Sequence, residues 1–229
     1  MSSNASTAGS FDESRFLKRT RTVHLVRLGL SVIATAGAIA VIACEAVPLR
    51  HHQDTAQWAS IGLALWPLNL DVRPTIASLA CGCVIAVLNL AYAVVALLPS
   101  PHPRIGLLNS YALTSSFAGF LTALVGVTFT IYRPSASYPS GFSRGETLQS
   151  WTCKWKAPGG LGTAPIEFSR DCIATRAGFG LLCTLLGLEI LMALAAIAGT
   201  LAQRDVSRRR EENARIEKLD FAAKQVYQA

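Results

Sequence analysis

One carboxyl group lies in the middle of a long apolar stretch, and no other residue of the chain is better placed to do chemistry. Glu189 is flanked by Leu188 and Ile190, and no Lys or Arg lies at a comparable depth in any apolar stretch. Because an apolar interior disfavours the charged form, we expect a protonated, hydrogen-bonded side chain. Asn89 is the best candidate partner, and Thr122 is another. Two interpretations stay open: an interhelical hydrogen bond worth about 1 kcal/mol, or a proton- or ion-binding site.

Two further motifs fit a chemical pattern only as strings of letters. Gly141–Gly145 matches G-x-S-x-G, but that motif requires a strand-to-helix turn, and here it lies in a Pro/Ser/Gly-rich loop. His51, His52 and Asp54 could supply metal ligands, but no further ligands with zinc-like spacing follow them. The sequence contains no P-loop and no dinucleotide fingerprint. We therefore expect no enzymatic activity, no bound metal and no cofactor.

The apolar stretches around these polar groups predict four transmembrane helices. Hydrophobic residues make up 51% of the chain and charged residues only 15%, against roughly 25% charged residues in soluble domains. A hydrocarbon core of ~30 Å needs about 20 apolar residues in helical form. The expected spans are 28–49, 75–98, 105–132 and 177–202. The predicted fold is an all-α membrane protein, a four-transmembrane-helix bundle within residues 23–203.

Basic residues next to the first and last spans predict the orientation. They are Arg15, Lys18, Arg19, Arg21 and Arg27 before the first span, and Arg204, Arg208, Arg209 and Arg210 after the last. Short positively charged segments favour the cytoplasm, so both termini are expected there and loops 50–74 and 133–176 outside. The six basic residues of loop 133–176 oppose this mildly, but long loops count less in the rule. We expect the plasma membrane or another secretory-pathway membrane.

Two terminal segments complete the expected organisation. Residues 1–22 begin with a Ser/Ala/Gly-rich stretch and are predicted to be a disordered cytoplasmic N-terminus. Residues 204–229 are dense in both signs of charge, which fits either a cytoplasmic helix or a solvated tail. Arg208, Arg209 and Arg210 would meet anionic lipid headgroups. The formal net charge of +7 follows from these flanking residues, and no basic patch with interleaved aromatics indicates nucleic acid.

The cysteines and tryptophans divide between loops and spans. Cys153 and Cys172 both lie in loop 133–176 and are expected to form a disulfide if that loop is outside; two free thiols are the alternative. The in-span cysteines, Cys44, Cys81, Cys83 and Cys183, are expected to be small packing residues. Trp58 and Trp66 predict a short helix on the outer leaflet, with partner recognition as the alternative.

Small residues recur at helical spacing in three of the spans. The sets are Gly29, Ala36, Ala40 and Cys44; Ser78, Gly82, Ala86, Asn89, Ala93 and Ala96; and Ser115, Gly119, Ala123, Gly126 and Thr130. Such faces allow close helix contact in lipid. They predict either a tight bundle or contacts with other copies. Glu45 lies near the outer end of the first span, where water or Arg50 is within reach.

The second outer loop carries a recognisable pattern. It contains Trp151-Thr152-Cys153-Lys154-Trp155 and then, leading into the last span, Phe168, Cys172, Arg176, Gly178 and Phe179. This resembles a group of uncharacterised four-span membrane proteins from filamentous fungi, whose second outer loop has a similar W-x-C-x-W and a second cysteine. Over residues 20–203 the layout also resembles the MARVEL-type tetraspans. The resemblance implies membrane organisation, trafficking or junction-like scaffolding without catalysis.

Two hypotheses about function follow. The first is a non-enzymatic tetraspan protein that organises or scaffolds a membrane region, with the bilayer, lateral protein partners or further copies of itself as its partners. The alternative is a small transporter, channel or auxiliary channel subunit that uses Glu189 and Asn89.

Overall fold

The computed structural model describes residues 4–57, 65–67, 70–98, 105–132, 146–155 and 166–228. Its helices are α1 (Asn4–Ala56), α2 (Arg73–Leu97), α3 (Ile105–Tyr132), α4 (Leu148–Lys154) and α5 (Ile166–Gln228). Four of them are long and apolar enough to cross a membrane, over Arg21–Ala56, Arg73–Leu97, Leu108–Ile131 and Glu167–Ile216. The chain is thus all-helical in its described part, and the four apolar helices indicate an integral membrane protein.

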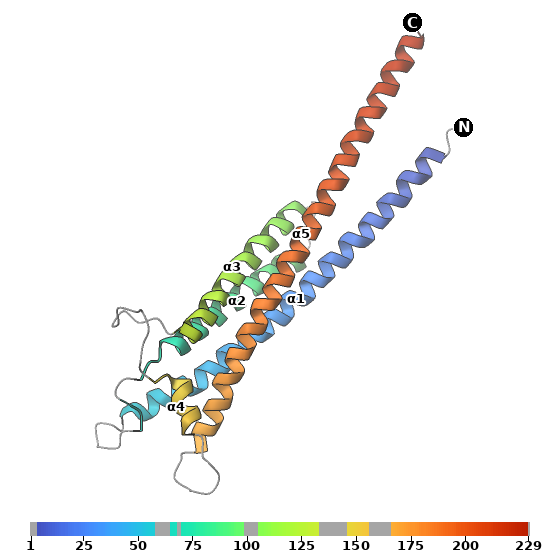
Figure 1. The fold of residues 1–229 in the computed structure, drawn as a ribbon. Coiled ribbons are helices and arrows are strands. Elements are labelled where there is room, and N and C mark those ends of the chain that lie inside the picture. The colour runs from blue at the N-terminus through green and yellow to red at the C-terminus, as the bar shows by residue number, and fades with distance from the viewer. Residues whose placement is uncertain are drawn as a thin grey trace, which may run out of the picture.

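The four long helices pack as a ring in the order α1, α2, α3, α5, with α5 also against α1. Both termini lie at one end of the bundle, which we call the terminal end (Figure 1). The short helix α4 lies at the opposite end, the loop end, and packs against α5. In this ring α2 faces α5 across one diagonal, and α1 faces α3 across the other.

Helices α1 and α5 are longer than the spans predicted from hydropathy, and they extend beyond α2 and α3 at the terminal end (Figure 1). Residues 1–22 were predicted to be disordered, and in the structure residues 4–22 belong to α1. No Pro interrupts that helix before Pro48, and residues that favour helix follow the Ser/Ala/Gly-rich start, among them Glu13, Leu17 and Lys18. Helix α5 likewise continues through residues 204–228, so the charged C-terminal segment is a helix.

Helix α5 also begins before its apolar part, inside the predicted loop 133–176. It starts at Ile166, with Glu167 in the first turn, where a carboxylate complements the helix dipole. Helix α1 likewise passes through Pro48 and ends at Ala56. These polar helix ends bring His51 and Asp171 to the same level at the loop end.

Helices α2 and α3 pack into the bundle mainly through small residues. Ser78, Gly82, Asn89 and Ala93 of α2 are buried, and so are Ser115, Gly119, Ala123 and Gly126 of α3. The set predicted on the first span instead faces outward at Gly29 and Ala36. Helix α1 packs through another face, and the apolar core consists of Ala34, Ala38, Val41, Cys81, Ile85, Ala123, Leu182 and Leu185.

Candidate functional site

The carboxyl group of Glu189 is enclosed at the centre of the bundle. Its side chain is 0% exposed, and Asn89 Nδ2 donates a hydrogen bond of 2.7 Å to Glu189 Oε1. Asn89 Nδ2 also donates to the Ile85 carbonyl at 3.1 Å. Thr122, the other predicted partner, donates instead to the Ala118 carbonyl of its own helix. The bond therefore joins α2 to α5 across the ring.

A glycine on α3 makes room for this carboxyl group. A Cβ atom placed on Gly119 would lie 2.6–2.8 Å from the carboxyl atoms of Glu189. Glu189 Oε2 and Asn89 Oδ1 are buried and have no hydrogen-bond partner among the described residues. One hydrogen bond thus holds the pair, and each residue keeps one unpaired oxygen.

A buried arginine near the terminal end was not singled out as a site residue by the sequence. Arg27 is only 4% exposed. Its Nη1 donates to Asn109 Oδ1 at 2.5 Å, and its Nη2 and Nε donate to the Ala195 carbonyl at 2.7 and 3.2 Å. Gly199 of α5 leaves the space that the guanidinium occupies. The signal for burial was weak, because basic residues before a span normally stay at the interface.

Arg27 belongs to a network that ties α1, α3 and α5 together. Asn109 accepts from Arg27 and donates from Nδ2 to Gln203 Oε1 at 2.8 Å. Because Arg27 lies on α1 and Asn109 on α3, their bond spans the second diagonal of the ring. Each diagonal of the ring is thus spanned by a polar bond, and the two bonds lie at different depths in the bundle.

A histidine between two carboxylates joins α1 to α5 at the loop end. His51 Nδ1 lies 2.5 Å from Asp171 Oδ2, and His51 Nε2 lies 2.6 Å from Glu167 Oε2. The rings of Trp66 and Phe168 pack against it, with centroids 5.8 and 5.9 Å away. The sequence signal was the spacing of Glu167 and Asp171, which places both on one helix face.

The segment that contains α4 is fastened over this end of the bundle. Cys153 of α4 and Cys172 of α5 form a disulfide, with Cα atoms 4.8 Å apart. Thr147 caps α4, accepting a bond from Ser150 N. The segment before α4 is also held to the start of α2, because Asp71 N donates to the Glu146 carbonyl at 2.8 Å. We call residues 146–155 the lid.

The loop tryptophans take different positions. Trp66 Nε1 donates to Thr55 Oγ1 at 2.8 Å, so this ring packs on the loop end of α1. Trp151 and Trp155 lie on the lid with ring centroids 5.5 Å apart, and Trp155 is 50% exposed. Trp58 lies outside the described residues, and so does most of the short helix predicted around it.

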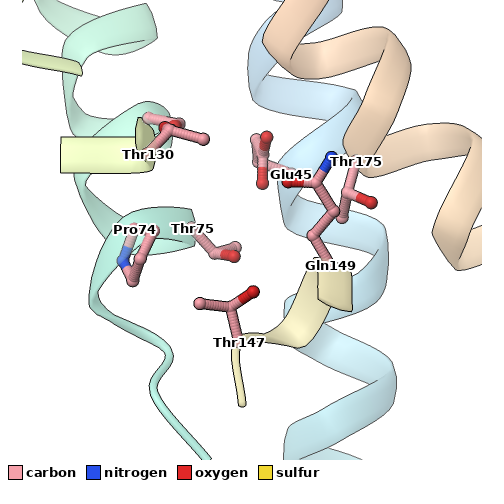
Figure 2. A pocket seen from close by; sticks show the side chains of 8 residues that line it. Glu45, Pro74, Thr75, Thr130, Thr147, Gln149 and Thr175 are labelled. Atoms are coloured by element: carbon pink, nitrogen blue, oxygen red, sulfur yellow. The ribbon is translucent and has the colours of Figure 1, made fainter. Parts of the chain in front are cut away.

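A small polar cavity lies beneath the lid, between all five helices (Figure 2). Glu45 points into it from α1 and is only 4% exposed. Arg50, the partner considered for Glu45, instead pairs with Asp54 at 3.7 Å. The hydroxyl-bearing residues that line the cavity are Thr75, Ser78, Thr130, Thr147 and Thr175. Its volume is about 10 Å³, room for about one water molecule.

The metal-ligand set considered from the sequence is not brought together. His51 bonds to Glu167 and Asp171, His52 packs against Trp66 with centroids 5.0 Å apart, and Asp54 pairs with Arg50. Among the described residues, no three His, Cys, Asp or Glu side chains form a group that could hold a metal ion. The G-x-S-x-G string, Gly141–Gly145, lies outside the described residues.

The buried polar groups thus fall at three levels: the His51 cluster and Glu45 cavity at the loop end, the Glu189–Asn89 pair in the middle, and the Arg27 network near the terminal end. Each contacts several helices, and none pairs a nucleophile with a general base. Comparison with known proteins finds no matching family, no matching curated protein and no matching solved structure.

Proposed function

We propose that this protein is a non-enzymatic tetraspan that organises a membrane region through lateral contacts of its helices. In this proposal both termini are cytoplasmic, the lid lies on the outer side, and the membrane is the plasma membrane or another membrane of the secretory pathway. The partners are other membrane proteins or further copies of the chain.

The enclosure of Glu189 is the observation that carries the proposal. A carboxyl group that conducts protons or ions needs access to water or to a polar path. Glu189 is 0% exposed, lies against Gly119 and bonds to Asn89. This position suits a side chain that bonds two helices together better than one that conducts protons or ions.

The outward faces of α1 and α5 provide surfaces for lateral contact. Nothing lies within 4 Å of a Cβ placed on Gly29 of α1 or on Gly180 and Gly187 of α5. Exposed glycines at such spacing let a neighbouring helix approach closely in lipid. The helical extension of α5 adds exposed Arg208 and Arg209 near the expected headgroups, which favours anionic lipid.

Proximity labelling from the C-terminus, combined with membrane fractionation, tests this proposal. We expect the variant Gly180→Leu/Gly187→Leu to lose several-fold of the labelling of its membrane-protein neighbours, because leucine fills the contact surface. Its abundance should stay unchanged, since both positions are open within the chain. Val87→Leu/Val94→Leu is the matched control, because both valines already present large side chains outward at 65% and 51% exposure.

The alternative, a small transporter, channel or auxiliary channel subunit, is favoured by the unpaired oxygens of Glu189 and Asn89. Flux measurements on purified protein in liposomes separate the two functions. The lateral-organiser proposal expects no proton or ion flux above that of empty liposomes, and unchanged neighbours for Glu189→Gln. Flux that Glu189→Gln abolishes, or a neighbour set insensitive to the glycine substitutions, would count against it.

A further inference from the structure

We propose that the cavity beneath the lid binds one small monovalent cation, of which Na⁺ is the representative, with the Glu45 carboxylate as its charged ligand. The site would tie the lid to the bundle, because the residues around it come from all five helices. This inference goes beyond the proposed lateral role and does not depend on it.

The charge around the cavity is unbalanced. Glu45 is only 4% exposed, and it makes no hydrogen bond or ion pair to any described residue. No basic residue is among those that line the cavity in the described part of the chain. Burial disfavours the charged form of Glu45 unless a cation is close, so in this proposal a positive ion in the cavity accompanies the carboxylate form. One carboxylate balances one positive charge, which favours a monovalent ion over Ca²⁺ or Mg²⁺.

Two of the hydroxyl groups around Glu45, those of Thr130 and Thr175, are oriented as acceptors toward the cavity. Thr130 Oγ1 donates its hydrogen to the Gly126 carbonyl at 2.9 Å, and Thr175 Oγ1 donates to the Asp171 carbonyl at 3.0 Å. A hydroxyl has one hydrogen, so each of these groups has only lone pairs left for the cavity. Such oxygens cannot satisfy a carboxylate by hydrogen bonding, but they can ligate a hard cation together with it.

Two further features indicate a built site. Thr75 is 6% exposed, and its hydroxyl, which makes no hydrogen bond to a described residue, points into the same space as Glu45 (Figure 2). On the other side Gly178 makes room for the carboxylate, because a Cβ there would lie 2.7 Å from Glu45 Oε1. Gln149 of the lid is among the lining residues, and its side-chain amide carries an oxygen that can ligate a cation. The volume of about 10 Å³ admits one water-sized particle and excludes an organic ligand.

Direct binding of radiolabelled Na⁺ to the full-length protein, purified in detergent, tests the proposal at constant ionic strength set with choline chloride. We expect saturable binding to the wild type. Glu45→Gln should weaken it at least tenfold by removing the charged ligand. Thr75→Val should also weaken it, and because that hydroxyl makes no bond within the described residues, this variant is expected to fold even if Glu45→Gln does not.

Two matched variants show whether an effect is specific. Asp54→Asn removes one negative charge from the same helix outside the cavity, and Thr184→Val removes an exposed threonine hydroxyl from α5. Both should bind Na⁺ like the wild type. A second readout is the apparent Tm, which a bound ligand raises by mass action. Replacing choline chloride by NaCl should raise the wild-type Tm by about 3 °C or more, and the Tm of Thr75→Val by less.

Three results would overturn the proposal. One is folded wild-type protein without saturable Na⁺ binding, which would mean that the cavity holds a water only. Another is an identical Tm in NaCl and choline chloride. The third is Na⁺ binding that Thr75→Val and Glu45→Gln both leave unchanged, which would place any bound ion elsewhere.

Discussion

At the scale of single residues, two of the buried carboxyl groups lie against glycines of neighbouring helices. Glu189 lies against Gly119 of α3, and Glu45 lies against Gly178 of α5. A side chain at either glycine would occupy the position of the carboxyl group. These two glycines are therefore part of the polar sites, and their small size does more than permit close packing.

Gly119→Ala should destabilise the bundle by about 1–3 kcal/mol, because the new methyl group would displace the Glu189 carboxyl from Asn89. Thermal unfolding in detergent measures the effect. The control is Gly187→Ala, where nothing lies within 4 Å of the new Cβ and the gain in helix propensity predicts an unchanged or slightly higher stability.

A double-mutant cycle isolates the contact. In a Glu189→Ala background the cost of Gly119→Ala should shrink, since the carboxyl that it displaces is gone. An equal cost in both backgrounds would show that Gly119 acts through other neighbours.

At the scale of elements, the bundle is held by polar bonds across both diagonals of the helix ring. Asn89 and Glu189 join α2 to α5, and Arg27 and Asn109 join α1 to α3. Between helices in lipid the hydrophobic effect contributes little, so such bonds and close packing of small residues must fix the arrangement. Two bonds at different depths restrict both the spacing and the relative rotation of the helices.

Arg27→Met should cost about 2–3 kcal/mol of stability, because it removes charge-assisted bonds and leaves Asn109 Oδ1 without its donor. Arg21→Met is the matched control. Arg21 lies earlier on the same helix and is exposed, so its substitution should change stability by no more than about 0.5 kcal/mol. Resistance to limited proteolysis and thermal unfolding report the difference. Equal effects of the two variants would mean that the Arg27 network contributes nothing.

At the scale of the whole molecule, the loop end is the more heavily fastened end of the bundle. The disulfide, the His51 cluster and the backbone bond from Asp71 to Glu146 all act there. At the terminal end, α1 and α5 extend past α2 and α3 (Figure 1). The fastening keeps the lid over the Glu45 cavity, while the extended helices remain available for contacts.

Cys153→Ser/Cys172→Ser should lower stability by about 3 kcal/mol, the typical effect of a bridge that closes a loop of this length, with 19 residues of sequence separation. Hydrogen exchange of residues 146–155 should speed up more than that of α2 or α3. Cys83→Ser is the control, because Cys83 is a free, exposed cysteine, and it should leave lid exchange unchanged. Lid exchange that is the same with and without the bridge would contradict the assigned role.

The sequence by itself determined the four spans and the pairing candidates, and it left the charged C-terminal segment open between a helix and a solvated tail. A hydrocarbon core demands long apolar helices, and this signal is local. The expected partner of Glu189 followed from matching depth along two spans, and the cysteine pair from sharing one loop. Residues 1–22 were predicted to be disordered because the chain begins with a Ser/Ala/Gly-rich stretch.

Only the tertiary structure decided which polar groups meet and which helix faces point inward. Arg27 resembles an interfacial arginine until α3 and α5 are seen to supply its acceptors. His51 and Asp171 are far apart in the chain, and the rotation of two helices brings them together. In the small-residue stripe of α1, Gly29 and Ala36 face outward, whereas the stripe of α3 is buried at Ser115, Gly119, Ala123 and Gly126. Depth in a membrane can be inferred from hydropathy, but rotation about a helix axis depends on its neighbours, and only the packed bundle fixes it.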